Sequence, residues 1–250
     1  MGSPSTSEIF FCGDLHGCFA HLAPAVQMYR PLALVLLGDM TPAQPLEDAL
    51  QDVLSEDVPV YWIPGNHDAD DDESWLRVWG SKLEAQNIHG RVIELPNGLR
   101  LAGLGGVFRA AVWHPASQSV PMFRTMREHA KATPRQERWQ GSGPHRKHWG
   151  TVYPEAFEHL AKQRADVLVT HEAPGYHPHG FGVLDELARQ LGVHTALHGH
   201  HHDALDSSAA WQAQGFKSYG VGLCGITALD GEGRVMVRVP GAFDAHSMRR

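Results

Sequence analysis

Residues 8–17 are EIFFCGDLHG, an apolar run that leads directly into a polar loop. A short apolar run bounded by glycine is typical of a buried strand, so we predict a strand over 8–12. Residues 18–30 then carry apolar side chains at helical spacing and predict a helix. The stretch is therefore a strand–loop–helix unit whose loop contains Asp14 and His16.

The same unit occurs twice more along the chain. We predict strands over 32–37 and 58–63, and helices over 46–54 and 74–86. The first of these strands ends in Gly38-Asp39 and the second in a Gly65-Asn66-His67-Asp68 loop. Three consecutive units predict a parallel sheet. Because ligands bind beyond the carboxyl ends of such strands, we expect Asp14, Asp39 and Asn66 to converge.

The second half of the chain predicts a second sheet. Pro96-Asn97-Gly98 is a hairpin turn between strands at 91–95 and 99–104. Further strands are predicted over 166–170, ending at His171, and over 195–197, leading into Gly199-His200-His201-His202, with a helix at 183–191. Strands at 217–221, 225–229 and 234–239 suggest an antiparallel finish. We therefore predict an α/β fold, a four-layer α/β/β/α sandwich of two mixed sheets flanked by helices, with polar loops at the carboxyl ends of the strands.

Residues 106–150 break this regular pattern. The stretch is rich in Pro, Trp and His, and residues 121–150 hold seven Lys or Arg against two Asp or Glu. We interpret 106–150 as a basic insertion, with some helix near 122–132, in a single domain spanning 8–240. The ends, 1–7 and 241–250, are expected to be flexible.

Composition narrows the function classes. The chain has 250 residues and a net charge of −7, which argues against a dedicated nucleic-acid coat protein. Its 18 histidines point toward metal ligation. Three cysteines offer no disulfide framework and favour a reduced, cytoplasmic setting. We see no signal peptide, and the longest apolar run, 32–37, is too short for a membrane span. The oligomeric state is left open.

The ordered set of motifs resembles the calcineurin-like metallophosphoesterase superfamily. The set is G-D-x-H-G, G-D, G-N-H-D, a strand-end His and G-H-x-H, from about Ile9 to Val239 without the insertion. Within it, GDLHGC at 13–18 is similar to the branch of bacterial and phage serine/threonine phosphatases and diadenosine tetraphosphatases. That branch continues its G-D with x-Val-Asp-Arg-Gly, whereas Met40-Thr41-Pro42-Ala43 follows here, so the match to this branch is incomplete.

The resemblance implies two divalent metal ions, with manganese first and iron or zinc as alternatives. A hydroxide bridging the metals would attack phosphorus in line. By similarity, Asp39 bridges; Asp14, His16 and His202 complete the first site, and Asn66, His171 and His200 the second.

The same resemblance implies roles beside the metals. His67 would assist the leaving oxygen, and Asp68 would accept a hydrogen bond from the other ring nitrogen of His67. His200 and His202, two residues apart at a strand end, should share a face, with His201 pointing away.

Arg109 is our candidate for a phosphate contact, because a guanidinium matches phosphate bidentately. A surface arginine in the insertion is the equally weighted alternative. The expected function is hydrolysis of a phosphomonoester or phosphodiester in a small, nucleotide-like molecule or a phosphoprotein. Two alternatives stay open, namely a non-catalytic protein-interaction scaffold of the same fold and a nucleic-acid-directed phosphodiesterase. The basic insertion alone supports the second.

Overall fold

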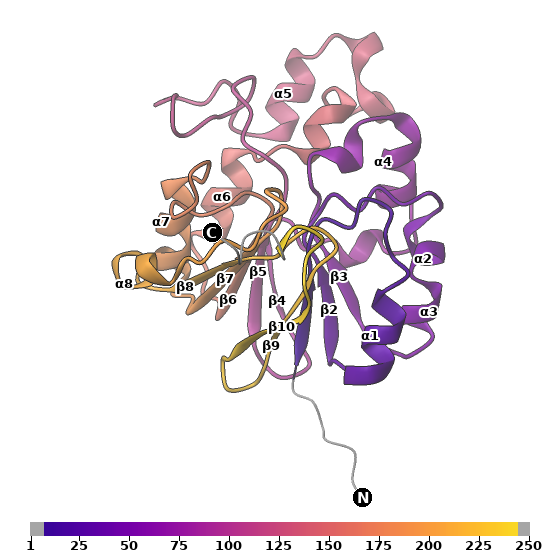
Figure 1. Cartoon of the computed structure of the whole chain (residues 1–250). Helices are drawn as coiled ribbons and strands as arrows, with labels where there is room; N and C mark the ends of the chain where they lie inside the picture. Colours follow the sequence, from indigo (N-terminus) through magenta and orange to yellow (C-terminus); the bar gives the residue numbers. More distant parts are fainter. Residues whose placement is uncertain (1–7, 245–250) are drawn as a thin grey trace, which may run out of the picture.

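The computed structural model describes residues 8–244, which form two five-stranded sheets stacked face to face with helices on both outer sides (Figure 1). One sheet has the order β10-β9-β1-β2-β3 and the other β4-β5-β6-β7-β8. One hydrophobic cluster lies between the sheets, and one more lies between each sheet and its helices. Three apolar layers separate four layers of structure, so the predicted sandwich is confirmed.

The strands of the first sheet are β1 (Ile9–Cys12), β2 (Ala33–Leu36), β3 (Val60–Trp62), β9 (Ile226–Leu229) and β10 (Val235–Val239). Those of the second are β4 (Arg91–Glu94), β5 (Arg100–Leu104), β6 (Val167–Thr170), β7 (Thr195–His198) and β8 (Lys217–Gly220). Strands β1, β2 and β3 run parallel, as do β5 to β8. The parallel strands of each sheet therefore place their following loops along one edge.

The helices are α1 (Leu22–Tyr29), α2 (Leu46–Ala49), α3 (Gln51–Leu54), α4 (Asp72–Trp79), α5 (Met126–Ala132), α6 (Pro154–Leu160), α7 (Gly182–Leu191) and α8 (Trp211–Gln214). Helix α1 begins later than the predicted residue 18, with Pro24 in its first turn, where a missing N–H costs no hydrogen bond. The helix predicted over 74–86 starts earlier, because Asp71 caps α4, and ends before Gly80.

Strand β1 shows why an uninterrupted apolar run precedes the first motif loop. Ile9 and Phe11 pack between the two sheets, whereas Phe10 and Cys12 pack toward the helices. Successive side chains of a strand point to opposite faces, and both faces of this central strand are covered. An uninterrupted apolar run is therefore required until the strand ends at Gly13.

The predicted antiparallel finish is wrong in one element. Strand β8 pairs parallel with β7 in the second sheet, and only β9 and β10 form an antiparallel pair, in the first sheet. The turn at 222–225 carries the chain from one sheet to the other between β8 and β9. Strand patterns alone do not show which sheet a strand joins.

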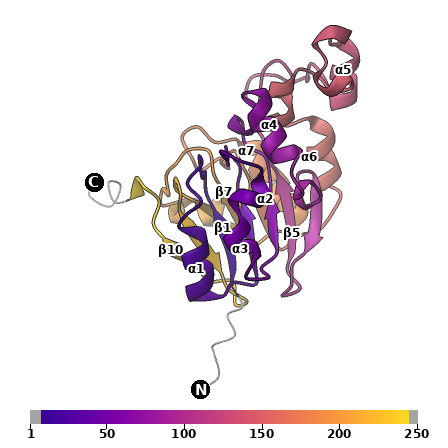
Figure 2. The same cartoon turned by 90° about the vertical axis from the view of Figure 1, so that its right-hand side faces the viewer.

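The basic insertion packs against the edge that carries the polar loops and stands above it (Figure 2). Its Trp139 and Trp149 make edge-on ring contacts with Trp75 of α4 at 5.5 and 5.0 Å between centroids. Its two ends return to the Gly65 loop, where the N–H of Gly106 donates to the carbonyl oxygen of Pro64 at 2.6 Å. Apolar burial therefore holds the insertion near the predicted site.

The expected flexible ends are tested only in part, since 1–7 and 245–250 lie outside the described residues. Residues 241–244 differ from that expectation, because the N–H of Ala242 donates to the carbonyl oxygen of Leu223 at 2.8 Å, and Gly241 and Asp244 are buried. Within residues 8–244, no helix has the length and apolar character needed to cross a bilayer.

Candidate metal centre

Loops from both sheets meet at the carboxyl ends of the parallel strands. Asp14, Asp39 and Asn66 follow β1, β2 and β3 in the first sheet, and His171 and His200 follow β6 and β7 in the second. The structure brings together all seven side chains that the sequence suggested as metal ligands, in two groups that share one carboxylate. They are Asp14, His16, Asp39, Asn66, His171, His200 and His202.

The first group consists of Asp14, His16, Asp39 and His202. One potential ligand atom of each lies within 4.8 Å of the others. The Nε2 atoms of His16 and His202 are 3.1 Å apart, and His16 Nε2 is 3.9 Å from a carboxylate oxygen of Asp39. Burial lowers the pKa of both imidazoles, which favours the neutral form that binds metals.

The second group consists of Asp39, His171 and His200, with Asn66 beside them. His171 Nε2 lies 3.4 Å from Asp39 Oδ2 and 3.2 Å from Asn66 Oδ1. His171 Nδ1 is held by the carbonyl oxygen of Leu37 at 2.8 Å. This contact orients the ring so that Nε2 points toward the other side chains.

Strained backbone accompanies this convergence. Nine non-glycine residues within 8–244 have φ between +37° and +71°, and four of them are His16, Asp39, His200 and His202. The left-handed conformation is costly for such residues and clusters at functional sites. It also corrects the strand argument for His200 and His202, because both lie in a left-handed loop after β7 rather than on one face of an extended strand.

Gly65 shows why glycine precedes the Asn-His pair. A β-carbon at Gly65 would lie 2.1 Å from Asp39 Oδ1 and 2.4 Å from the backbone nitrogen of Asp39. Such distances are well inside contact range, so the Gly65 loop reaches the Asp39 carboxylate only without a side chain.

The buried charges of the centre suit a cation. Burial raises the pKa of Asp14 to about 7. Burial would lower the pKa of His171, but the nearby Asp39 and Asp14 carboxylates outweigh it and raise that pKa to about 10. Burial likewise opposes ionisation of Asp39, yet His171 holds the Asp39 pKa below its usual range. Fully buried carboxylates of this kind are stabilised by a positive charge, so the donor set fits metal ions.

His67 lies beside this centre but takes a different partner from the one predicted. Its Nδ1 is 2.5 Å from Oδ2 of Asp70, and its ring centroid is 5.5 Å from that of His16. In the sequence, Asp70 is the first of four consecutive acidic residues at 70–73, and such runs are usually solvated surface. The i, i+3 spacing of His67 and Asp70 was the available signal.

Asp68 is a correction to the predicted site. Its side chain is fully buried, and its oxygens accept hydrogen bonds from the backbone N–H groups of Met40, Thr41 and Gly65 at 2.7, 3.2 and 2.8 Å. The expected hydrogen bond from His67 is therefore wrong, because backbone amides of the two neighbouring loops occupy both carboxylate oxygens. Asp68 fastens the Asp39 loop to the Gly65 loop.

Three further side chains border the second group. Glu172 is buried, which raises its pKa to about 7, and its Oε2 lies 3.8 Å from His200 Nε2. The charge of Arg109 acts on Glu172, and the buried Nε atom of Arg109 has no hydrogen-bond partner within residues 8–244. His201 does not simply point away, since its ring stacks on His177 at 3.9 Å and joins Glu172 and His200 in a third group of potential ligands.

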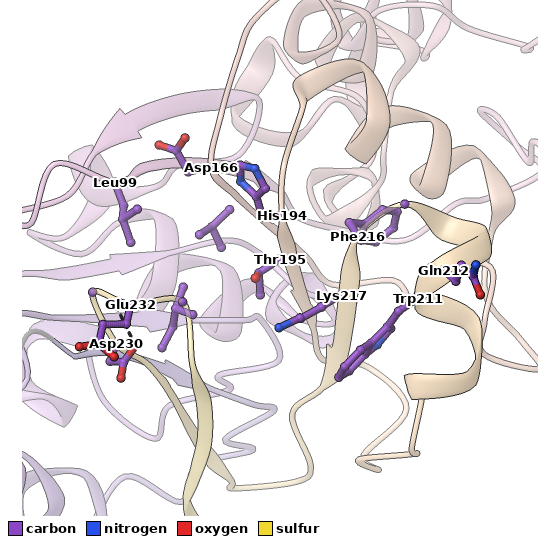
Figure 3. Close-up of a pocket in the computed structure, with 15 residues that line it drawn as sticks. Leu99, Asp166, His194, Thr195, Trp211, Gln212, Phe216, Lys217, Asp230 and Glu232 are labelled. Atoms are coloured by element: carbon purple, nitrogen blue, oxygen red, sulfur yellow. Dashed lines mark hydrogen bonds between the residues drawn. The ribbon is translucent and has the colours of Figure 1, made fainter.

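A cavity of about 660 Å³ lies away from this centre (Figure 3). It is lined by the first residues of β6, β7 and β8, whereas the candidate ligands follow the last residues of β6 and β7. Figure 3 shows Lys217 extending into it between Trp211 and the turn at 230–233. This cavity is therefore separate from the candidate metal centre.

Known proteins share both the sequence pattern and the fold. The calcineurin-like phosphoesterase family model matches residues 7–204. An uncharacterized protein from Haemophilus influenzae is 39% identical over 195 residues, covering 78% of this chain and 83% of that protein. The crystal structure of TT1561 from Thermus thermophilus is 14% identical and covers 94% of this chain and 99% of that one, with a TM-score of 0.57, a likeness of fold alone. Since the family model spans most of the sequence and its motif residues meet at one edge of the fold, this chain belongs to the calcineurin-like phosphoesterase family.

Proposed function

We propose that this chain is a metal-dependent hydrolase of phosphomonoesters or phosphodiesters. The observation that carries the proposal is the convergence of seven nitrogen and oxygen donors from both sheets, with Asp39 common to two groups. Divalent ions held there supply Lewis acidity toward phosphoryl oxygens and a nucleophile drawn from water. Manganese is our first choice, and iron and zinc suit the same donor types.

The seven donors would be shared between two ions in the same way as they fall into the two ligand groups. Asp14, His16 and His202 would hold one ion, and Asn66, His171 and His200 the other, with Asp39 serving both. The neutral imidazoles of His16 and His202 and the buried carboxylates support the assignment.

His67 is the residue we assign to the leaving group. Its side chain is 47% exposed, so substrate can reach it. Asp70 holds Nδ1, which leaves Nε2 as the ring nitrogen that can meet a substrate at the candidate metal centre. A proton at Nε2 can pass to the leaving oxygen, or hydrogen bond to it as negative charge develops there.

Arg109 is the residue we assign to phosphate binding. Its neighbour in sequence, Phe108, donates its N–H to Oε1 of Glu172 at 3.1 Å, and the Nε of Arg109 lacks a hydrogen-bond partner within residues 8–244. Arg109→Ala should raise KM about tenfold or more with little loss of metal, because a charge-assisted hydrogen bond contributes about 1.5–3 kcal/mol. Arg135→Ala, at an exposed position of the same insertion, is the matched control.

The substrate class is proposed from the branch resemblance and from the exposure of His67 beside the ligand groups. A small nucleotide-like molecule and a phosphoprotein both present a phosphate that the same donors accommodate. The insertion beside the Gly65 loop would contact the non-reacting part of the substrate, where specificity arises.

The decisive experiment is reconstitution of metal-free protein with Mn, Fe, Co, Ni or Zn, followed by assays on p-nitrophenyl phosphate and its bis-ester. We expect turnover with at least one metal. His67→Ala should keep bound metal and lose turnover, whereas Asp39→Asn should lose both. His159→Ala, at an exposed position of α6, should behave as the wild type. Tight metal binding with no turnover on any substrate would favour a scaffold over an enzyme.

The same purified protein can be used to measure whether the basic insertion binds nucleic acid. Arg146 and Arg124 already pair with Asp72 and Glu158, which reduces the basic charge free to meet phosphates. We expect weak binding of single-stranded DNA; tight, salt-dependent binding would favour a nucleic-acid-directed phosphodiesterase.

A further inference from the structure

The turn at 222–225 contacts two of the three loops that supply the first ligand group, those after β1 and β7. The N–H of Cys224 donates to the carbonyl oxygen of Asp14 at 3.2 Å, and the N–H of Gly13 donates to that of Gly225 at 3.1 Å. The N–H of Leu223 donates to the carbonyl oxygen of His202 at 3.4 Å. A movement of the 222–225 turn therefore reaches the backbone of two candidate ligands.

Two cysteines meet at this junction although they are far apart in sequence. The thiol of Cys224 lies 3.5 Å from the carbonyl oxygen of Leu15, and the N–H of Cys18 donates to that same oxygen at 2.7 Å. Burial, with a smaller contribution from the neighbouring Cys18 thiol, raises the pKa of the Cys224 thiol. Both are reduced, Cys18 is exposed and Cys224 is half-buried.

The surroundings of the pair differ from those of the third cysteine. Cys12 is fully buried in β1, where neither oxidant nor a second thiol reaches it. The exposed Cys18 thiol lies 3.8 Å from Nδ1 of His21, a group able to take up its proton. Cys224 has a left-handed backbone with φ of +54°, a conformation that is uncommon for a residue other than glycine.

We propose that Cys18 and Cys224 are a reversible dithiol pair, which hydrogen peroxide converts to a disulfide between the 222–225 turn and the 13–18 loop. Peroxide oxidises the exposed Cys18 thiol to a sulfenic acid and is itself reduced to water. The Cys224 sulfur then attacks the Cys18 sulfur, the S–S bond forms, and a second water leaves. Two thiols and one peroxide thus give one disulfide and two waters. A dithiol regenerates the pair by exchange.

The disulfide would also weaken metal binding, and this consequence rests on the proposed function. A disulfide holds its sulfurs at about 2.05 Å, much closer than two unbonded thiols can approach each other. Closing that gap draws Cys18 toward the 222–225 turn. His16, two residues earlier in the same loop, then leaves its position opposite His202.

The test uses the full-length, metal-free, reduced protein treated with one equivalent of hydrogen peroxide. We expect two of its three thiols to disappear, and a peptide pair joining Cys18 to Cys224 in non-reducing mass spectrometry. Dithiothreitol should restore all three thiols. Cys18→Ser and Cys224→Ser should each abolish the linked pair, and Cys12→Ala should retain it. Three surviving thiols, links only between molecules, or over-oxidised Cys18 without a link would overturn the proposal.

Calorimetric titration with Mn²⁺ tests the effect on metal binding separately from the formation of the disulfide. We expect at least a fivefold weaker affinity for the oxidised wild type than for the reduced, and no change on peroxide treatment of Cys224→Ser. An unchanged affinity in linked protein would refute the effect on the metal centre. If reduced protein binds no Mn²⁺, Fe²⁺ or Zn²⁺, the proposed function fails, while the linked peptide still decides the dithiol pair.

Discussion

Nδ1 of His67 lies 2.5 Å from Oδ2 of Asp70, although the two side chains are 47% and 55% exposed. Partial burial opposes the charged form of the imidazole, but Asp70 and Asp39 outweigh it, so the pKa of His67 is raised. The contact also fixes which ring nitrogen faces the candidate metal centre. Asp70 is therefore a positioning residue for His67.

Asp70→Asn should lower kcat about 10- to 100-fold, because partners that orient a functional histidine have effects of this size. KM and metal content should stay near the wild-type values, since Asp70 belongs to neither ligand group. Asp70→Glu should recover part of kcat. Glu73→Gln, in the same acidic run, is the control. Wild-type kcat in Asp70→Asn would show that His67 needs no such partner.

Asp68→Ala should destabilise the metal-free protein by about 3 kcal/mol or more, because several buried backbone N–H groups lose their acceptor. The measurement is urea unfolding, with exposed Asp52→Ala of α3 as the control, which should change stability by less than about 0.5 kcal/mol. An Asp68→Ala variant as stable as the wild type would mean that the two loops hold together without the carboxylate.

Gly65→Ala should lose metal binding and destabilise the protein by about 1–3 kcal/mol, since overpacking a filled site has this cost. The added methyl group collides with the backbone and carboxylate of Asp39, neither of which can retreat from a buried position. Gly182→Ala at the start of α7, where a β-carbon meets open space, should leave stability unchanged or slightly raised. Metal titration and thermal unfolding compare the two variants, and equal behaviour would contradict the close approach.

His89 should make stability depend on pH outside the metal centre. Its Nδ1 accepts a hydrogen bond from the N–H of Gly105 at 3.0 Å, and burial lowers its pKa to about 4. The unfolded chain, with a pKa of about 6.5, binds the proton first as pH falls. The free energy of unfolding should therefore decrease between about pH 6.5 and pH 4, by about 1–3 kcal/mol from this group.

His89→Asn keeps an acceptor near the same place but does not titrate. Urea unfolding across this pH range should give a shallower dependence for the variant than for the wild type. Parallel curves for the two proteins would indicate that His89 keeps an ordinary pKa in the folded state.

Much of the fold was predictable because its signals are local. The run from Ile9 to Cys12 had to be a buried strand, since both of its faces meet apolar layers. The order of strand, loop and helix then led to parallel sheets with polar loops at one edge. The pairing of β8 with β7 was not predictable, because a strand at 217–221 fits the edge of either sheet equally well.

The choice of ligand types was readable in the same way, from residues at strand ends. The chain order alone placed Asp14, Asp39, Asn66, His171 and His200 after separate strands, and the sheets bring them together. The hydrogen-bond partners of these side chains were harder to predict from the sequence. Asp68 and Asp70 are both acidic and stand one and three residues after His67, and the i, i+3 spacing of Asp70 was the one signal that favoured it.

Hydrophobic periodicity and strand-end motifs, which arise within a few residues, thus specified the layers and placed polar residues at the strand ends, and the resemblance to the phosphoesterase family identified which of them are candidate ligands. Contacts such as Asp68 with the Met40 amide, or the Cys224 thiol with the Leu15 carbonyl oxygen, join segments distant in sequence. These contacts depend on left-handed turns and on close packing between loops. They form only when the two sheets stack and bring the loops within hydrogen-bond distance.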